Sequence, residues 1–407
     1  MNTPRHFIFL TLGFHPDQVG GAFRYVAEVA TRLAARGHRV EVICPNPANQ
    51  LAATEPRSGV TLHRFPNGEG FFWTNWRREN AAASQLLHAC LASVNTAPAA
   101  RPLIVVCHAF LAPAAADAPA PQVALFTGPW AEEFLFSRRS RRRSLPKRCF
   151  DTLVADRLRA VERAGLARAR RILTISDYYV AQLPRWHPVA LPPVTMMSGG
   201  VDAETFRPAT DRAAVRAKLG LAPDAFVFLT VRRLDPRMGL LTLLEAFAAA
   251  RRGHPHARLW IAGSGPQRDE LTARAATLGL GDNVRFLGFV PDAELPDCYR
   301  AADCTVVPSL ALEGFGLVTA ESLACGTPVL GSDSGATPEL LAPLGQHLLF
   351  TSGSTESLAA KLREVLAAPA SLPARERCRE YAVQAFSWNR PVAALEQAAA
   401  DFTGGAR

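Results

Sequence analysis

Glu313 and Glu321, with seven residues between them, are the carboxylates whose surroundings most clearly suggest chemistry. The loop Gly314-Phe315-Gly316 precedes a helix predicted for residues 317–325, which Gly326 can end. Backbone N–H groups at a helix start lack intrahelical acceptors and attract anions, and the two glycines let a ligand come close. Carboxylates accept paired hydrogen bonds from vicinal hydroxyls. The segment therefore predicts a ligand with a phosphate between two polyols, such as a sugar nucleotide, although a glutamate pair at this spacing also occurs on solvated helix faces.

The elements that would position this segment read as two successive α/β units. Apolar runs of strand length recur with helical patterns between them, first over residues 6–12, 38–44, 103–110, 122–128 and 171–176, and again over 225–231, 257–263, 284–290, 304–309 and 327–332. Continuous rather than alternating hydrophobicity indicates parallel sheets covered on both faces. The clearest helix begins near Gly21 and ends at Gly37, with one face predicted to comprise Phe23, Val26, Ala27, Ala30, Leu33 and Ala34.

A proline-rich stretch over residues 186–208 reads as a connection and marks a domain boundary near residue 200. We predict an N-terminal Rossmann-like, acceptor-side domain over 1–199, a C-terminal Rossmann-like donor domain over 200–384, and a final helix over 385–407 that returns to the first domain. Ligands of open α/β sheets bind outside the carboxyl ends of the strands. The expected site is therefore a cleft between the two domains.

Composition and charge narrow the class of protein. The chain has 407 residues, 48% of them apolar and 20% charged, which is ordinary for a globular enzyme. Its net charge of +9 belongs to the first half, because residues 1–200 carry 24 Lys and Arg against 13 Asp and Glu. No apolar stretch is long enough to span a membrane. Eight cysteines without a C-x-x-C pair fit a reducing, cytoplasmic environment.

Many segments in order and at matching spacing resemble the retaining glycosyltransferases of family 4, which have the GT-B fold of two Rossmann-like domains. These segments are the glycine pair opening the helix GGAFRYVAEVATRLAARG, ILTISDYY, SGGVDAETFRP, RRLDPRMGLLTLLEAF, WIAGSGPQRDEL, FLGFVPDAEL, YRAADCTVVPS, EGFGLVTAESLACGTPVLGSDSGATPEL and a late FSW. The resemblance covers nearly the whole chain. It implies an enzyme that transfers a hexose from a nucleotide-diphosphate sugar to an acceptor hydroxyl, with retention of the anomeric configuration.

The resemblance also implies roles for particular residues. Glu321 would hold the nucleotide ribose hydroxyls. The donor sugar and diphosphate would be contacted by Glu313 and by the amides of the segment from Gly314 through Phe315 and Gly316 to Leu317. In the first domain, Gly20 and Gly21 resemble the loop that approaches the donor phosphate. His108 resembles an active-site histidine near the transferred sugar, but a histidine satisfied by the backbone is an equally open interpretation.

Two departures from the family pattern bear on catalysis. The family's R-L-x-x-x-K-G reads Arg233-Leu234-Asp235-Pro236-Arg237-Met238-Gly239 here, so the arginine is kept and methionine replaces the lysine. Arg232 or Arg237 could supply the second positive charge from a neighbouring position. Thr127 stands where relatives commonly have histidine, and a threonine hydroxyl cannot carry a proton near neutral pH. Thr127 could still hydrogen-bond a sugar hydroxyl, and it is a candidate for the acceptor site together with Trp130 and Glu133. A loop aromatic packed on its own domain is an equally open interpretation of Trp130.

The sequence predicts no metal and no cofactor besides the nucleotide-sugar co-substrate, with a UDP- or GDP-sugar favoured. It contains no D-x-D pair and no zinc spacing among its cysteines and histidines. The leaving diphosphate would then be neutralised by a helix N-terminus, Arg233 and a neighbouring arginine. The sequence does not determine the base, the sugar, the acceptor or the oligomeric state.

The segment 137–148 carries seven Arg or Lys beside apolar residues, which suits an anionic membrane surface. The expectation is a cytoplasmic protein attached peripherally to the inner face of a membrane, with a sugar, a lipid-linked molecule or a small molecule as acceptor and no nucleic-acid partner. Two rivals remain open: a non-catalytic sugar-nucleotide or glycan-binding protein of the same fold, motivated by Met238 and Thr127, and a hydrolase, epimerase or phosphorylase of the same fold.

Overall fold

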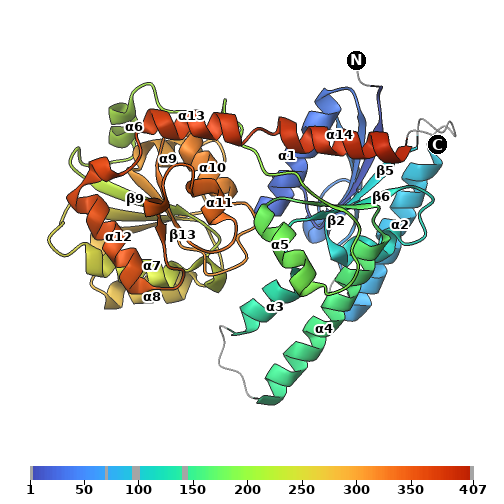
Figure 1. Ribbon diagram of the computed structural model, residues 1–407, viewed down its shortest axis with the longest axis horizontal. Coiled ribbons are helices and arrows are strands. Elements are labelled where there is room, and N and C mark those ends of the chain that lie inside the picture. The colour runs from blue at the N-terminus through green and yellow to red at the C-terminus, as the bar shows by residue number, and fades with distance from the viewer. Residues whose placement is uncertain (1–2, 69–71, 94–100, 140–144, 404–407) are drawn as a thin grey trace. The chain divides into compact units, whose positions relative to one another are not determined.

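A computed structural model describes residues 3–68, 72–93, 101–139 and 145–403. The chain forms two compact units, residues 1–199 together with 388–407, and residues 200–387 (Figure 1). Each unit is an α/β assembly with its own sheet and its own core.

Unit 1 is built on a sheet of eight described strands in the order β3-β4-β2-β1-β5-β6-β7-β8. Neighbouring strands are parallel except for β3 and β4, which form an antiparallel hairpin at one edge. The strands are β1 (His6–Leu10), β2 (Arg39–Asn46), β3 (Thr54–Arg57), β4 (Val60–Pro66), β5 (Leu103–Val106), β6 (Gln122–Phe126), β7 (Arg171–Thr174) and β8 (Val194–Met196). The centre of the sheet is buried because β5, and β1 after His6, are apolar at every position and can face helices on both sides.

Both faces of this sheet are covered by helices. Ile8 and Leu10 pack with residues of α2 and of the short 3₁₀ helix η3, and strand alternation turns Phe7 and Phe9 to the other face. The C-terminal helix α14 packs on α1 and β5, and its Glu396 accepts hydrogen bonds from Arg36 and His38 at 2.8 and 2.9 Å. The helices of unit 1 are α1 (Gly21–Ala35), α2 (Phe72–Ala92), η3 (Ala109–Ala115), α3 (Trp130–Arg139), α4 (Leu145–Arg168), α5 (Asp177–Trp186) and α14 (Asn389–Thr403).

Unit 2 is built on a fully parallel sheet of six strands in the order β11-β10-β9-β12-β13-β14. Its strands are β9 (Phe226–Val231), β10 (Ala257–Ala262), β11 (Val284–Gly288), β12 (Cys304–Val307), β13 (Val329–Ser332) and β14 (Leu349–Phe350). Its helices are α6 (Arg212–Lys218), α7 (Leu240–Ala250), α8 (Arg268–Thr277), α9 (Leu295–Ala301), α10 (Leu317–Ala324), α11 (Thr337–Leu341), α12 (Thr355–Ala367) and α13 (Arg375–Ala385). The central strands β9 and β12 are neighbours, so their carboxyl-end loops meet.

Every predicted strand is present, with small changes of boundary. The run predicted over 103–110 ends at Val106, because His108 begins η3. The stretch interpreted as a connection contains the short edge strand β8, and β3, β4 and β14 were not predicted. In α1, Tyr25 and Val29 are buried, whereas Phe23 and Ala34, which were predicted on the buried face, are only half-buried.

No helix in the described part of the chain combines the length and apolar character needed to cross a bilayer.

Candidate functional site

The loops that follow β9 and β12 are tied together at the carboxyl end of the unit 2 sheet. The backbone N–H of Leu310 donates to the carbonyl of Arg237 at 2.8 Å, and Arg237 Nη1 donates to the carbonyl of Leu312, also at 2.8 Å. The Ala336 N–H after β13 donates to the Glu313 carbonyl at 2.9 Å. Adjacent strands therefore present their loops as one rigid edge, which is where parallel sheets bind ligands.

Glycines at two positions make this close packing possible. A Cβ added to Gly239 would lie 1.9 Å from the Pro308 carbonyl oxygen, and one added to Gly335 would lie 2.5 Å from the Glu313 carbonyl oxygen. Both glycines also have positive φ values, 69° and 65°. Any larger residue would push the Glu313 loop away from its neighbours.

Glu313 lies in this edge with a buried cation beside it. Its carboxylate pairs with the guanidinium of Arg232 and accepts a hydrogen bond from Ser309 Oγ at 2.6 Å. Burial raises the pKa of Glu313, but the charge of Arg232 and the hydrogen bonds from Arg232 and Ser309 lower it more, so the net pKa lies below its usual range. Glu313 is therefore a carboxylate at neutral pH and can accept hydrogen bonds from hydroxyl groups.

The predicted helix start beside Glu313 is present. Gly316 adopts a φ of 91° and α10 begins at Leu317 and ends at Ala324, followed by Gly326 with a φ of 77°. The N–H groups of Leu317 and Val318 precede the first hydrogen bond of the helix, which the Thr319 N–H donates to the Gly316 carbonyl at 2.9 Å. The loop and helix therefore have the predicted conformation, and anion binding at this helix start stays a prediction.

Glu321 is buried inside α10 and is only 5% exposed. Its Oε2 accepts a hydrogen bond from the Tyr299 hydroxyl at 2.9 Å, from the neighbouring helix α9. A buried carboxylate held by a phenol has a fixed orientation, as recognition of vicinal hydroxyls requires.

The three candidate arginines have different surroundings. Arg232 is 8% exposed and contacts Glu313, whereas Arg233 faces solvent and has no hydrogen-bond or ion-pair partner for its side chain among the described residues. Arg237 sits in the 3₁₀ turn Pro236–Met238 and binds the Leu312 carbonyl. The side chain of Arg233 is therefore accessible to an anionic ligand, while Arg237 stabilises the loop that contains Leu312.

In unit 1, Gly20 and Gly21 begin the fifteen-residue helix α1, as predicted. Gly20 has an extended backbone and no side chain to cap the helix, so the first N–H groups of α1 are not covered by a capping side chain. A Cβ on Gly20 would approach the Phe23 ring at 3.1 Å.

His108 follows β5 and caps η3. Its Nδ1 accepts a hydrogen bond from the Phe110 N–H at 3.1 Å, and its ring stands edge-on to Trp130 at 5.4 Å. Burial lowers the pKa of His108 to about 4, so the ring is neutral at neutral pH and its proton is on Nε2. His108 can donate a hydrogen bond to a ligand but is not a proton reservoir.

Trp130 is the first residue of α3, rather than part of a loop. Its ring contacts Phe110 at 5.6 Å and Phe72 at 6.2 Å, so it packs against its own unit. Glu133, one turn further along α3, is partly exposed and lies near Gly128.

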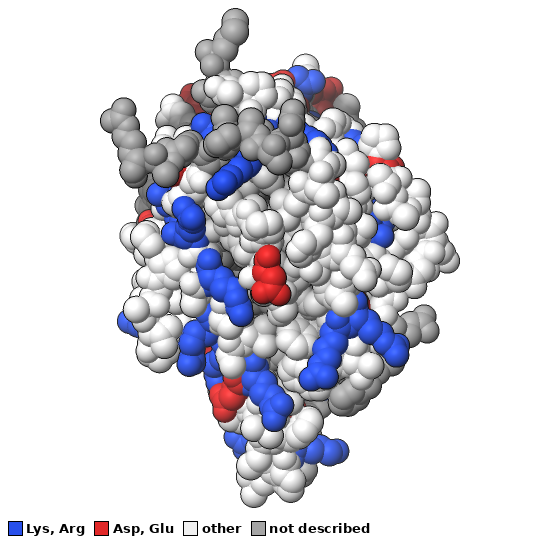
Figure 2. All heavy atoms as spheres, turned by 90° about the vertical axis from the view of Figure 1, so that its right-hand side faces the viewer, with Lys and Arg blue, Asp and Glu red and all other residues white. Residues whose placement is uncertain are grey.

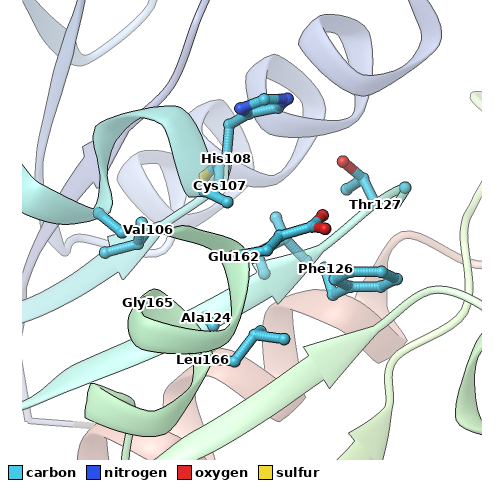
Figure 3. Close-up of a pocket in the computed structure, with 13 residues that line it drawn as sticks. Val106, Cys107, His108, Ala124, Phe126, Thr127, Glu162, Gly165 and Leu166 are labelled. Atoms are coloured by element: carbon cyan, nitrogen blue, oxygen red, sulfur yellow. The ribbon is translucent and has the colours of Figure 1, made fainter. Parts of the chain in front are cut away.

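A cavity of about 30 Å³ lies at the carboxyl ends of β5 and β6 and is lined by His108, Thr127 and Glu162 (Figure 3). This volume accommodates a water molecule and not a hexose. Glu162 was not predicted. It belongs to α4, is 2% exposed, and its Oε1 accepts a hydrogen bond from the Trp130 N–H at the start of α3, 2.8 Å away.

The charge state of Glu162 is set by its burial. Burial raises its pKa to about 7, with the Trp130 and Ala131 N–H groups opposing the rise. The nearest histidine, His187, is 3.7 Å away, and burial lowers the pKa of His187 to about 4. At neutral pH that histidine is uncharged, so the contact is not an ion pair.

Replacing Glu162 by glutamine is expected to stabilise the protein at pH 8 by about 3 kcal/mol, since each unit of pKa shift is worth about 1.4 kcal/mol. A raised pKa means that the folded state holds a proton which the unfolded state releases, so stability falls as pH rises from the ordinary 4.5 to about 7. Urea unfolding from pH 4.5 to 8 measures this slope. Glu162→Gln should lack this pH dependence of stability. The control Asp156→Asn, which changes an exposed residue of the same helix, should keep it. An unchanged slope in Glu162→Gln would contradict the raised pKa of Glu162.

The tertiary structure also gathers three side chains of metal-ligand type, Glu41, His63 and Cys90, within 4.8 Å of one another in unit 1. Glu41 already accepts hydrogen bonds from Arg39 at 2.7 Å, His63 at 3.0 Å and His6 at 3.1 Å. A metal ion would have to displace the arginine. We interpret the cluster as a buried hydrogen-bonded network.

The cysteines are free thiols, and all except Cys149 are buried. Burial raises the pKa of Cys304 and of Cys107 well above the usual range, so these thiols stay protonated. They pack as small apolar side chains, as the sequence indicates.

The fold is of the GT-B type, with two Rossmann-like α/β units, and the second unit carries a helix start and a carboxylate at one edge of its sheet. Residues 19–205 match the model of glycosyltransferase family 4, and residues 211–385 match the model of glycosyl transferases group 1. The chain belongs to the family 4-type group 1 glycosyltransferases.

Relatives and solved structures agree with this family. The chain is 36% identical over 227 residues to the D-inositol 3-phosphate glycosyltransferase of Segniliparus rotundus, a match that covers 55% of this chain and 50% of the relative. The chain thus spans about half the length of the curated relatives it matches. The fold is similar to that of sucrose-phosphate synthase from Thermosynechococcus elongatus, with a TM-score of 0.80, 23% identity and coverage of 97% of this chain and 98% of the other. It is also similar to the Anabaena protein HepE in complex with UDP-glucose, with a TM-score of 0.72, 20% identity and 98% coverage of both chains.

Proposed function

We propose that the protein transfers a hexose from a nucleotide-diphosphate sugar to an acceptor hydroxyl, with retention of the anomeric configuration and without a metal ion, in the synthesis of a glycan, a glycolipid or a glycosylated metabolite. The observation that carries the proposal is the rigid edge of unit 2, where the partly buried Glu313 and the buried Glu321 flank a glycine loop and a helix start. Those groups match the hydroxyls and phosphates of a sugar nucleotide.

In this proposal each group of the edge has one role. Glu321 accepts hydrogen bonds from the ribose hydroxyls, and Glu313 accepts them from hydroxyls of the donor sugar. The N–H groups from Gly314 to Leu317 and the exposed guanidinium of Arg233 bind the diphosphate and stabilise the charge it gains as it leaves. His108, neutral at neutral pH, donates a hydrogen bond from Nε2 to the transferred sugar.

The reaction breaks the bond between the anomeric carbon and the diphosphate oxygen and forms a bond between that carbon and the acceptor oxygen on the same face. The acceptor's proton passes to the leaving phosphate oxygen, so no protein group needs to ionise. Thr127 can accept or donate a hydrogen bond but cannot supply a proton. The lowered pKa of His108 supports this scheme, because the ring is no acid at neutral pH.

Names of similar proteins guide the choice of substrates. HepE binds UDP-glucose in its solved complex, which favours a UDP-sugar as donor here. The curated relatives named for D-inositol 3-phosphate, together with the basic first half of this chain, favour an anionic acceptor. Inositol phosphates and lipid-linked sugars are therefore the first acceptors to test.

The test has two stages. Thermal unfolding with UDP, GDP, ADP and dTDP, with and without EDTA, should give a shift for one nucleotide that EDTA does not change, because a ligand at 100 times its dissociation constant stabilises by about 2.7 kcal/mol. Release of that nucleotide from its sugar conjugate should then require an acceptor, and NMR of the product should show the donor's anomeric configuration. Binding without turnover would instead support a sugar-nucleotide-binding protein, and turnover without acceptor would support a hydrolase.

We propose further that the start of α4 docks on an anionic membrane surface, at the inner face of the membrane. Leu145, Phe150 and Leu153 are 73%, 64% and 55% exposed, whereas Asp151 and Ala155 on the same turns are buried. At 100° per residue these exposed side chains fall on one side of the helix. They form an unpartnered apolar stripe.

Positive charge accompanies this stripe. Lys147 and Arg148 are exposed in the same turns, while residues 140–144 of the basic segment 137–148 lie outside the described residues. Figure 2 shows a face over which Lys and Arg are spread and acidic side chains are few, with a largely uncharged tip at its lower end. Each cation near an anionic bilayer contributes about 1 kcal/mol.

The variant Lys147→Gln/Arg148→Gln is expected to bind vesicles of phosphatidylcholine and phosphatidylserine about 10–30-fold more weakly than the wild type. Leu145→Ser/Phe150→Ser should weaken binding while keeping the charge. The matched control, Arg252→Gln/Arg363→Gln, removes two exposed charges from unit 2 and should bind as the wild type does. Equal loss in both charge variants would mean attraction by net charge alone and would contradict docking through α4.

A further inference from the structure

Arg232 is a buried cation at the end of β9 whose guanidinium faces three side chains of unit 2. Its Nη2 donates to Ser309 Oγ at 2.5 Å and to Met238 Sδ at 3.0 Å, and pairs with the Glu313 carboxylate. Arg232 is 8% exposed. Desolvating the charge of a buried arginine is unfavourable, so interactions with polar or charged groups must offset that cost.

The contact with Met238 places the guanidinium of Arg232 next to the side chain of residue 238. Position 238 is where the sequence pattern of the family has a lysine, and here an uncharged thioether stands there. The thioether is a weak acceptor and leaves room for a neighbouring cation, whereas a lysine would repel it. The charge missing at residue 238 is thus present beside it, contributed by residue 232.

The neighbouring arginines are not equivalent to Arg232. Arg237 Nη1 donates to the carbonyls of Leu312 and Ala311, at 2.8 and 3.4 Å, and so holds the loop that precedes Glu313. Arg233 is exposed, and its side chain has no hydrogen-bond or ion-pair partner among the described residues. Arg232 contacts both the Met238 side chain and the Glu313 carboxylate, so its charge lies between the position of the missing lysine and the site.

Resting on the proposed function, we infer that Arg232 is the second cation of the donor site: it replaces the lysine absent at Met238, contacts the donor diphosphate and orients Glu313 toward the sugar. A guanidinium has five N–H donors, and the contacts described above involve Nη2 alone. Nε and Nη1 have no hydrogen-bond partner among the described residues, which leaves donors for phosphate oxygens.

The inference is tested by removing the positive charge at residue 232 and introducing one at residue 238. Arg232→Ala should lower kcat/KM about 10–100-fold, the loss expected for a hydrogen bond to a charged group. Arg232→Ala/Met238→Lys should recover activity to within about 5-fold of the wild type, because the cation then reaches the same place from residue 238. Arg252→Ala, an exposed arginine outside the site, is the control and should change nothing.

Nucleotide binding separates this role from a structural one. Arg232→Ala should weaken UDP binding while leaving uridine binding unchanged, or GDP and guanosine if the wild type prefers guanine. Equal weakening of diphosphate and nucleoside binding would overturn the inference. So would a double variant, Arg232→Ala/Met238→Lys, that regains the wild-type melting temperature but is as inactive as Arg232→Ala. If the wild type binds the diphosphate but shows no acceptor-dependent turnover, the proposed function fails, yet the binding comparison still decides the role of Arg232.

Discussion

Replacing Glu321 by glutamine is expected to weaken binding of the donor nucleotide about 10–100-fold, the loss typical of hydrogen bonds to a charged acceptor. The carboxylate is buried and held by Tyr299 at 2.9 Å, so the substitution changes charge without changing volume. Glutamine can still accept the tyrosine's hydrogen bond, which keeps the fold. Calorimetric titration of UDP into each protein measures the effect.

The matched control for this variant is Tyr299→Phe. It removes the hydrogen bond that orients Glu321 but leaves the carboxylate, so it should cost about 1 kcal/mol of stability and weaken nucleotide binding less than Glu321→Gln does. If Tyr299→Phe weakens UDP as much as Glu321→Gln does, the glutamate acts through packing of α9 on α10 and does not contact the ribose. If neither variant affects UDP, the nucleotide lies elsewhere.

Replacing Glu41 by glutamine is expected to destabilise unit 1 by about 3 kcal/mol, the range found when one partner of a buried charge network is removed. Glu41 is 3% exposed and accepts hydrogen bonds from Arg39, His6 and His63. Urea unfolding at pH 7 measures the change. Glu28→Gln, in a partly exposed helix pair with Arg32, is the control and should lose no more than about 0.5 kcal/mol.

The pH dependence of the same pair of variants checks the cause. Burial raises the pKa of Glu41, but the hydrogen bonds from His6, His63 and Cys90 and the charge of Arg39 lower it more, so the folded-state pKa is well below the ordinary 4.5. Its contribution is therefore full above pH 4.5 and is lost as the pH falls toward the folded-state pKa. The difference between wild type and Glu41→Gln should shrink below pH 4.5, and a difference that is independent of pH would refute the ionic origin.

Much of the donor half of the candidate site is predictable from the sequence because its signals are local. The loop from Glu313 to Gly316, the helix that follows it and the glycine that ends it lie within one continuous segment, and they adopt the predicted conformations. The strands were found for the same reason, since continuous apolar runs mark strands buried on both faces. The strands missed, such as β8 and β14, are three and two residues long, too short to show a pattern.

The positions that sequence reasoning left open depend on partners distant in the chain. Whether Arg232 or Arg237 lies beside Met238 depends on where a loop some seventy residues later places Ser309 and Leu312. The contacts of Trp130 with Phe110 and Phe72 likewise depend on residues distant in the chain, and its role in acceptor binding stays a prediction. Residue type alone could not distinguish these alternatives.

By itself, the sequence determined the two α/β units, the glycine loop with its flanking glutamates and the asymmetry of charge. These features depend on hydrophobic periodicity, turn residues and composition, which involve only residues close to one another in the chain. Only the tertiary structure brought Arg232 to Met238, Glu162 to the start of α3 and Cys90 to Glu41 and His63. These groups meet because parallel strands and the helices between them return distant residues to one edge or one core. Burial there, rather than residue type, decides how the groups ionise.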